Sequence, residues 1–349
     1  MSNIKDVAKL ASVSISTVSH TLRGTKPVSK KLKNKINEAI AELSYEVNPV
    51  ASSLKSKKTN NIGLIIPGIT RIFFPQVIKG IQDQCAKNGY NLTFCDSNEQ
   101  LEKEKYSVHL LNSNWVDGII LGSVNTEDDS EYWELLHKLG RRRKKIPIVS
   151  LERDLARVGI DSVMVNNIEG GCLATRHLIK CGCKNIVHIT GPKYSCLANA
   201  RQEGFRKELG KQKKMQVNEI IAEGDFSPLS GYSTIKELLN TGRIFDGVFS
   251  ANDQMAVGAL KAIKEHGHQI PEDIKIVGFD NTFVASIVSP SLTTINVPKY
   301  QMGVAAVDLI MKKIATPDME PVNIELPINL IVRQSTDIRS DSSWELFGW

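Results

Sequence analysis

The sequence has no apolar run long enough to cross a membrane. Even residues 61–69 are interrupted by Pro67 and Gly68, whereas a spanning helix needs about eighteen or more consecutive apolar residues. Residues 4–24 also lack the cationic segment, unbroken apolar run and small-residue cleavage site of a secretory signal. We therefore expect a soluble, cytoplasmic protein with no membrane partner.

Disulfide and metal frameworks are missing as well. The six cysteines show no scaffold rhythm, so without a secretory signal we expect them to stay reduced. Cys181 and Cys183 could supply half of a zinc site, but a structural zinc normally needs four ligands. No second Cys/His cluster at finger spacing exists in the sequence. The sequence thus predicts neither a metal nor another cofactor.

The signatures of common enzymes are also absent. The chain contains no G-x-G-x-x-G, Walker, G-x-S-x-G or H-E-x-x-H motif. Its seven histidines are scattered, and His177 and His188 are better interpreted as packed or surface side chains than as catalytic bases. We therefore expect a binding protein and no enzyme.

What the chain does have is an ordinary globular composition with an uneven distribution of charge. Of its 349 residues, 41% are hydrophobic and 23% are charged, which suits two or three domains that each bury a core. Residues 1–60 carry eleven Lys or Arg against four Asp or Glu, whereas the whole chain has a net charge of +6. The excess positive charge therefore lies in one small N-terminal segment, which is typical of a module that binds a polyanion.

Three short helices are predicted in this basic segment. Apolar spacing predicts a helix at residues 4–10, and Ser14 can cap a second helix that ends at Gly24. A third helix, at about residues 30–43, carries an apolar stripe that packs on the first two. The stripe consists of Leu32, Ile36, Ala39, Ile40 and Leu43. A plain three-helix bundle would explain the stripe, but a helix-turn-helix also explains why the second helix exposes so few long side chains, because that helix enters the major groove.

The start of the second helix is the expected recognition surface. Ile15, Ser16 and His20 would face the bases. The hydroxyls of Ser14 and Thr17 would meet phosphate oxygens together with the free amides of the helix. The predicted DNA-contacting residues of the head are Ser14, Ile15, Ser16, Thr17, His20, Lys26 and Ser29.

From residue 62 onward, apolar segments of strand length alternate with helical patterns. The expected strands fall within residues 62–67, 91–97, 117–123, 146–152, 185–191, 219–225, 246–253 and 274–281. Such alternation predicts parallel sheets with crossover helices, and two sets of about four strands predict an α/β body of two doubly wound lobes. A ligand is then expected at the carboxyl ends of the strands, in the cleft between the lobes.

Side chains that follow these strands suit a polyhydroxylated ligand. Asp280 and Asn252 supply hydrogen-bonding groups, and Arg201 can present a forked donor to hydroxyls or a carboxylate. Phe226 offers a flat ring for stacking. Structural roles would also explain these residues: Asn252 or Asp253 can cap a helix, Asp280 can hold a turn, and Phe226 can belong to the core.

Ordered motifs along nearly the whole chain resemble those of a known family. They are "IKDVAKLASVSISTVSHTLRG", "LSYEVNPVASSLKSKKTNNIGLIIP", "VDGIIL", "GGCLATRHLI", "EGDFSPLSGY", "SANDQMAVGALKAI", "IKIVGFDN" and "SPSLTTINVP". In this order they are similar to the lactose/galactose-repressor (LacI/GalR) family of bacterial transcription regulators. The resemblance implies a helix-turn-helix head and two lobes like those of periplasmic sugar-binding proteins. The expected domains are 1–46 (head), 47–60 (hinge helix), 61–160 with 291–325 (first lobe), 161–290 with 326–340 (second lobe) and 341–349 (tail).

The resemblance also implies roles for particular residues. Leu54 in the hinge would insert between base pairs from the minor groove and kink the duplex, although a flexible linker is the alternative interpretation of this segment. Glu152 stands where many family members have Asp. The residues at effector-contacting positions are Phe73, Phe74, Glu152, Arg201, Phe226, Asn252 and Asp280.

The expected function is that of a repressor that binds a near-palindromic operator in double-stranded DNA as a homodimer. The expected effector is a sugar or sugar derivative in the cleft. A solute-binding receptor whose head docks on another protein is the alternative. Within residues 75–90, Val77, Ile78, Ile81 and Cys85 share a helical face that could form the dimer surface, but this face could equally pack on the protein's own sheet.

Overall fold

The computed structural model describes residues 2–23, 26–45, 58–124, 130–141, 144–211, 216–340 and 343–344. The chain divides into two compact units, Met1–Thr59 and Asn60–Trp349. Most of the expected hinge, including Leu54, lies outside the described residues, as do the predicted helix stop at Gly24 and most of the tail.

The first unit contains the three helices predicted from the sequence. They are α1 (Ile4–Leu10), α2 (Ile15–Arg23) and α3 (Lys30–Glu42). Asn3 begins α1 with a capping box, because its side chain accepts from the amide of Lys5 while Asp6 accepts from the amide of Asn3. The helices enclose a small core of Val7, Ala8, Ala11, Val18, Ile36 and Ala39. Of the predicted stripe on α3, Leu32 is 37% exposed and lies outside this core.

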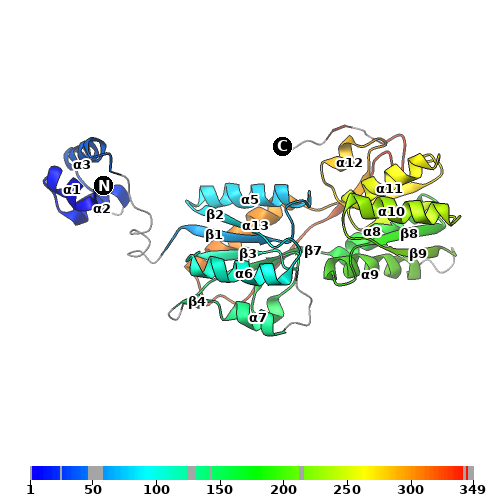
Figure 1. Ribbon diagram of the computed structural model, residues 1–349, viewed down its shortest axis with the longest axis horizontal. Helices are drawn as coiled ribbons and strands as arrows, with labels where there is room; N and C mark the ends of the chain where they lie inside the picture. Colours follow the sequence, from blue (N-terminus) through cyan, green and yellow to red (C-terminus); the bar gives the residue numbers. More distant parts are fainter. Residues whose placement is uncertain are drawn as a thin grey trace. The chain divides into compact units, whose positions relative to one another are not determined.

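The second unit begins with a lobe built on a six-stranded parallel sheet. Its strand order is β13-β7-β6-β3-β1-β2, and every neighbouring pair is parallel. The strands are β1 (Asn61–Ile66), β2 (Asn91–Asp96), β3 (Gly118–Leu121), β6 (Ile148–Leu151), β7 (Asp161–Val165) and β13 (Asn323–Leu326). Its helices are α5 (Phe74–Lys87), α6 (Leu101–Ser113), α7 (Ser130–His137) and α13 (Lys299–Ala315). Figure 1 shows the sheet between α5 and α6. A small hairpin of β4 (Gly140–Arg141) and β5 (Lys144–Lys145) and a 3-10 turn, η1 (Ala156–Val158), complete this lobe.

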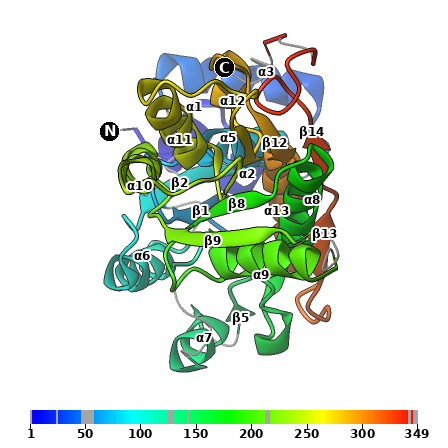
Figure 2. The same ribbon diagram turned by 90° about the vertical axis from the view of Figure 1, so that its right-hand side faces the viewer.

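The second lobe repeats this architecture. Its sheet has the order β14-β12-β11-β10-β8-β9, in which only β14 runs antiparallel to its neighbour. The strands are β8 (Asn185–Thr190), β9 (Asn218–Glu223), β10 (Gly247–Ser250), β11 (Lys275–Asp280), β12 (Thr293–Asn296) and β14 (Asn329–Ile331). The helices are α8 (Asn167–Lys180), α9 (Cys196–Lys211), α10 (Pro228–Asn240), α11 (Asp253–Glu265) and α12 (Val284–Ile287). Figure 2 shows the sheet between α9 on one side and α10 with α11 on the other. The prediction of two doubly wound α/β lobes is therefore confirmed.

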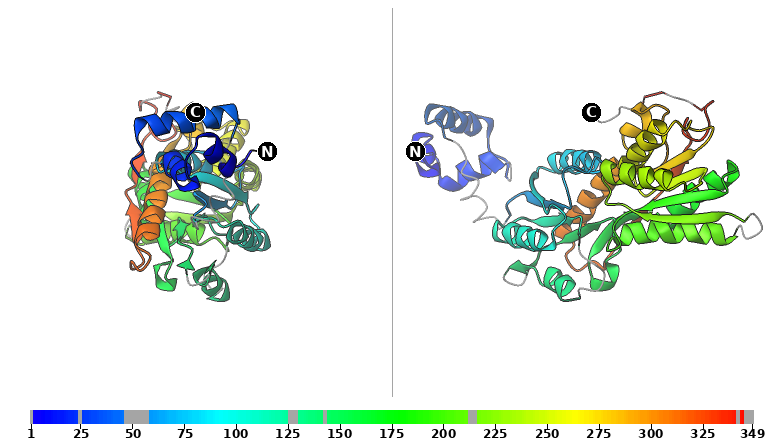
Figure 3. Two further views of the ribbon diagram at one scale, coloured as in Figure 1. Left: turned by 90° about the vertical axis from the view of Figure 1, so that its left-hand side faces the viewer. Right: turned by 45° about the vertical axis from the view of Figure 1, so that its right-hand side comes forward.

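The chain crosses between the lobes at places that differ from the expected boundaries. β7 begins at Asp161, where we expected the second lobe, yet it pairs with β6 and β13 of the first. β12 falls in the segment 291–325 assigned to the first lobe, yet it pairs with β11 and β14 of the second. The physical reason is that a strand joins whichever sheet offers a free edge, and the strand's own pattern does not reveal that edge. Only after β12 does the chain return, so that α13, orange in Figure 3, packs within the first lobe.

The apolar face of α5 belongs to the interior of its own lobe. Val77, Ile81 and Cys85 are almost completely buried in the core of the protein, and Ile78 is partly buried against the same core. Of the two interpretations of this face, packing on the protein's own sheet is therefore the one that the structure supports. None of the helices in the described part of the chain is both long enough and apolar enough to traverse a bilayer.

Candidate DNA-binding surface and inter-lobe cavity

The first turn of α2 presents a cluster of hydroxyl groups. The Ser14 Oγ accepts from the amide of Thr17 at 3.1 Å, so Ser14 caps the helix as predicted. The same oxygen lies 2.7 Å from Ser16 Oγ and 2.8 Å from Thr17 Oγ1. Ser14 and Ser16 are exposed, and Ile15 is 42% exposed. The helix start thus offers small polar groups and one apolar side chain to an approaching surface.

The remaining residues of the predicted DNA surface have mixed environments. His20 is half-buried one turn after Ser16, and Lys26 is exposed. Ser29 is exposed but caps α3, because its Oγ accepts from the amide of Leu32 at 3.4 Å. This capping role of Ser29 was not predicted from the sequence.

All seven predicted effector residues line one cavity between the lobes. Phe73, Phe74, Glu152, Arg201, Phe226, Asn252 and Asp280 surround a volume of about 30 Å³, together with Arg71, Leu197 and Gln254. An adjoining cavity of about 50 Å³ shares Arg71, Glu152, Leu197 and Phe226 with it. Because one water needs at least about 10–15 Å³, these spaces hold a few waters each. A larger ligand can enter only if side chains or lobes move.

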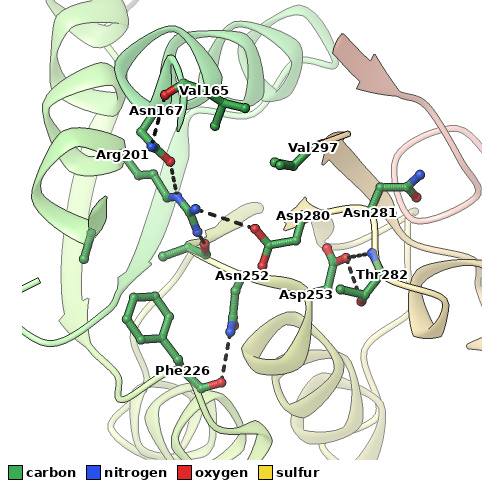
Figure 4. Close-up of polar contacts among 12 residues, drawn as sticks. Val165, Asn167, Arg201, Phe226, Asn252, Asp253, Asp280, Asn281, Thr282 and Val297 are labelled. Atoms are coloured by element: carbon green, nitrogen blue, oxygen red, sulfur yellow. Dashed lines mark hydrogen bonds and ion pairs between the residues drawn. The ribbon is translucent and has the colours of Figure 1, made fainter. Parts of the chain in front are cut away.

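Arg201 is fixed from several directions at the base of the cavity (Figure 4). It is 3% exposed, and its Nε donates to Asn167 Oδ1 at 2.8 Å. One terminal nitrogen donates to the carbonyl of Ala251 at 2.5 Å, and the other lies 3.6 Å from Asp280 Oδ1. The guanidinium also stacks 3.8 Å from the centre of the Phe279 ring. Its charge is therefore presented in a single orientation.

The cavity brings two acidic groups close to this one cation. Burial raises the pKa of Asp280 to about 8, against the opposing effect of Arg201. Burial also raises the pKa of Glu152, and Arg201 and Arg71 oppose this shift. Asp280 Oδ1 is buried and receives no hydrogen bond from any described residue. It is therefore available to a ligand, as an acceptor when ionised or as part of a carboxylic acid when protonated.

Phe226 and Asn252 form the wall of the cavity on the side of the second lobe. Asn252 is the N-cap of α11, because its Oδ1 accepts from the amide of Met255 at 2.9 Å. Its Nδ2 donates to the carbonyl of Phe226 at 3.0 Å. Asp253 lies at the first helical position and instead binds Thr282. Of the two capping candidates in the sequence, Asn252 is thus the cap.

Three residues that line the cavity have positive φ angles, a backbone conformation that residues other than glycine rarely adopt. The φ angles are 66° at Glu152, 69° at Phe226 and 104° at Asp280. Each residue follows or ends a strand at the cavity. Non-glycine residues with positive φ are uncommon, and such strain concentrates where the surrounding structure positions a functional group. This clustering is an independent indication that the cavity is a site.

The groups that cross from one lobe to the other were not predicted from the sequence. The Arg71 guanidinium lies 4.8 Å from the centre of the Phe226 ring and 2.7 Å from Glu99 Oε1. The amide of Ile72 donates to Gln254 Oε1 at 3.1 Å. Arg71 directly precedes "IFFP" in the sequence, so its closeness to Phe73 was a usable signal. Gln254 lies two residues after Asn252, so its closeness to a predicted effector residue was a signal of the same kind.

Metal binding has no counterpart among these groups. In the part of the chain that the structure describes, no cluster of three or more His, Cys, Asp or Glu side chains is arranged to hold a metal ion.

Comparisons with known proteins connect both surfaces to one family. A family model described as "Bacterial regulatory proteins, lacI family" matches residues 3–48, and a "Periplasmic binding protein-like domain" model matches residues 175–336. The ribose operon repressor of Halalkalibacterium halodurans is 36% identical over 336 residues, which cover 96% of this chain and 97% of that protein. The HTH-type transcriptional repressor PurR of Edwardsiella ictaluri has the same identity and coverage.

Solved structures agree with this relationship. The lac repressor dimer bound to operator and an anti-inducer superimposes with a TM-score of 0.86 at 30% identity, and the match covers 96% of this chain and 99% of that chain. A LacI-family regulator from Enterococcus faecalis with bound ribose gives a TM-score of 0.69 at 29% identity, covering 79% and 98%. The two units therefore define a DNA-binding regulator with a periplasmic-binding-protein-like body. The chain belongs to the lacI family of bacterial regulatory proteins, which confirms the resemblance found in the sequence.

Proposed function

We propose that this protein is a transcriptional repressor that binds a near-palindromic operator as a homodimer and is controlled by a sugar in the inter-lobe cavity. The observation that carries the effector proposal is the buried Arg201–Asp280 pair, in which the Asp280 carboxyl keeps an oxygen available within the cavity. The exposed first turn of α2 supports the DNA proposal.

The homodimer follows from the small size of the recognition surface. One turn of α2 with Ser14, Ile15 and Ser16 can contact only a few base pairs. A second copy related by a two-fold axis doubles the number of contacts, and the operator must then repeat its half-site in inverted orientation. The solved lac repressor to which this chain is similar is a dimer on its operator.

A sugar suits the chemistry of the cavity. Sugar hydroxyls both donate and accept, so they can pair with the Asp280 and Glu152 carboxyls and with the Arg201 guanidinium. Phe226 can stack on the apolar face of a sugar ring. The regulators of similar structure include complexes with ribose and with D-xylulofuranose, which supports a monosaccharide.

A purine is the second candidate, because repressors named PurR are as similar in sequence as the ribose operon repressor. A purine has a flat ring with few hydroxyl-like donors, so it would use the aromatic groups Phe73, Phe74 and Phe226 more than the two carboxyls. The cavity presents two carboxyls and two guanidiniums, from Glu152, Asp280, Arg71 and Arg201, and this many polar partners favours the hydroxyl-rich sugar.

The decisive experiment is fluorescence anisotropy on a labelled duplex from the protein's own upstream region. It should be run alone and with D-ribose, D-xylulose, hypoxanthine or guanine, and with a random duplex as the control. We expect one of the sugars to shift the binding midpoint by about tenfold, equivalent to about 1.4 kcal/mol of coupling. A shift by a purine alone would overturn the sugar proposal. Equal affinity for both duplexes would overturn sequence-specific repression.

A further inference from the structure

Lys299 is a buried cation that connects the two lobes. It is the first residue of α13, a helix of the first lobe, and it is 3% exposed. Its Nζ donates to the carbonyl oxygens of Asp280 at 2.5 Å, Asn281 at 2.8 Å and Val297 at 3.2 Å. Asp280 is the last residue of β11 in the second lobe, and Asn281 follows it. One ammonium group therefore joins a helix of the first lobe to the loop that carries Asp280.

The loop that Lys299 holds is constrained on both sides. The φ angles are 104° at Asp280 and 49° at Asn281, so both residues lie in a region that side chains disfavour. Asp253 fixes the next residue, since its Oδ2 accepts from the Thr282 amide at 2.6 Å and from the Thr282 hydroxyl at 3.0 Å (Figure 4). The Asp280 carboxyl faces the cavity between these two anchors.

The helix that begins at Lys299 is packed so closely on α5 that the two backbones touch. A Cβ added to Gly80 would lie 2.1 Å from the carbonyl oxygen of Tyr300, and one added to Gly303 would lie 2.2 Å from that of Val77. No deformable side chain separates the helices at these points. A shift in the first turn of α13 must therefore move α5, whose first residue, Phe74, also lines the cavity.

We infer that Lys299 is a positioning residue that couples the state of Asp280 in the cavity to α13 and α5 of the first lobe. A ligand hydroxyl that binds the Asp280 carboxyl acts on a residue whose own carbonyl is held by the Lys299 ammonium. The loop can then move only together with the first turn of α13 or with the loss of charge-assisted hydrogen bonds. The inference rests on the proposed function, because it concerns how an effector in the cavity reaches the rest of the regulator.

Lys313 provides a matched control on the same helix. It is 8% exposed, and its Nζ donates to the carbonyls of Met319 at 2.6 Å and Glu320 at 3.2 Å. It also lies 3.1 Å from Asp161 Oδ2 in β7. Lys313 thus binds carbonyls as Lys299 does, but its partners lie between α13 and β13 or in β7, within the first lobe. Lys313→Met removes a buried ammonium from α13 without touching the second lobe.

The test is a mutant cycle read by hydrogen–deuterium exchange of the full-length protein, without ligand or DNA. Asp280→Asn is introduced into the wild type, Lys299→Met and Lys313→Met. We expect Asp280→Asn to change exchange at least about threefold in peptides from α5 and the first turn of α13, in the wild type and in Lys313→Met but not in Lys299→Met. A change of equal size in Lys299→Met would overturn the inference, and so would no change in the wild type.

Two further measurements keep the outcomes distinct. If Lys299→Met does not fold, Lys299→Gln takes its place, because it retains a donor but no charge, and we expect a reduced but measurable transfer. In a second experiment D-ribose is the probe and the operator midpoint is the readout. We expect about a tenfold shift in the wild type and Lys313→Met and less than about a twofold shift in Lys299→Met. Absence of the shift in the wild type would count against the proposed effector, whereas the exchange cycle alone decides the role of Lys299.

Discussion

The backbone amide of Ile72 in the first lobe donates a hydrogen bond to Gln254 Oε1 in the second lobe, across 3.1 Å. Gln254→Leu removes the acceptor while keeping a side chain of similar size. A hydrogen bond is worth about 0.5–1.5 kcal/mol, so this contact between the lobes should be weakened roughly two- to tenfold. Amide exchange at Ile72, followed by mass spectrometry, should accelerate by a similar factor. Gln301→Leu, an exposed position on α13, is the control, and unchanged exchange at Ile72 in Gln254→Leu would show that the bond contributes nothing.

The raised pKa of Asp280 predicts how stability varies with pH. Burial raises this pKa to about 8, so the folded protein holds a proton that the unfolded chain releases near pH 4. The stabilisation from Asp280 is therefore complete below about pH 4 and is lost as the pH rises to about 8. One proton gives a slope of at most about 1.4 kcal/mol per pH unit. Asp280→Asn should flatten the fall in the free energy of unfolding between about pH 5 and pH 8, as measured by urea denaturation.

A suitable control for this pH experiment is Asp83→Asn. The Asp83 side chain is 41% exposed, and its hydrogen bond with Lys79 lowers its pKa, so its contribution to stability changes only at acidic pH. The curve above about pH 5 should therefore be the same for Asp83→Asn as for the wild type. A pH profile of Asp280→Asn that also coincides with the wild type would contradict the pKa assigned to Asp280.

The sequence predicted β1, β3, β6, β8, β10 and β11 because each of these buried parallel strands is a nearly unbroken apolar run. It missed β7, which is also buried but begins with the two polar residues of "DSVMV". All eight expected strands are present, whereas β7, β12, β13 and β14 were not predicted. The edge strand β13 alternates between exposed and half-buried residues, and β12 reads "TTIN", which is short and half polar. Which sheet each strand joins depends on free edges brought together by the whole fold, and this information is absent from any local pattern.

The residues of the candidate site also include some that the sequence predicted and some that it did not. The seven residues inferred from the family resemblance line one cavity, because the family's order of elements places them there, whether they end a strand, as Asp280 does, or lie within a helix, as Arg201 does. Gln254 escaped prediction because its contact with Ile72 exists only across the two lobes. The positive φ angles of Glu152 and Phe226 could not be predicted from the sequence either, because glycine and asparagine are the usual local signals for that conformation.

The contact between α5 and α13 predicts a strong effect of a single methyl group. Gly80→Ala would place Cβ 2.1 Å from the carbonyl oxygen of Tyr300, and backbone cannot yield as a flexible side chain does. We expect a loss of about 1–3 kcal/mol in the free energy of unfolding, measured by chemical denaturation. Gly210→Ala is the matched control, because Gly210 lies in α9 and, apart from its own helix backbone and chain neighbours, no atom of the described residues lies within 4 Å of the added Cβ. That change should stabilise the protein by up to about 1 kcal/mol, and equal effects of the two changes would refute the close packing.

Mutation of the exposed apolar side chain at the start of α2 should affect DNA recognition without affecting stability. Ile15 is 42% exposed and lies outside the core of the first unit, so Ile15→Ala should change the free energy of unfolding by less than about 0.5 kcal/mol. If Ile15 contacts a base in the operator, its loss should weaken operator binding by about 1 kcal/mol, or roughly fivefold. Binding to a random duplex should stay the same, because that binding depends on phosphate contacts. Leu10→Ala, at a position in α1 that is 44% exposed, tests whether any exposed apolar residue of this unit has the same effect. Equal losses on both duplexes for Ile15→Ala would remove Ile15 from the recognition surface.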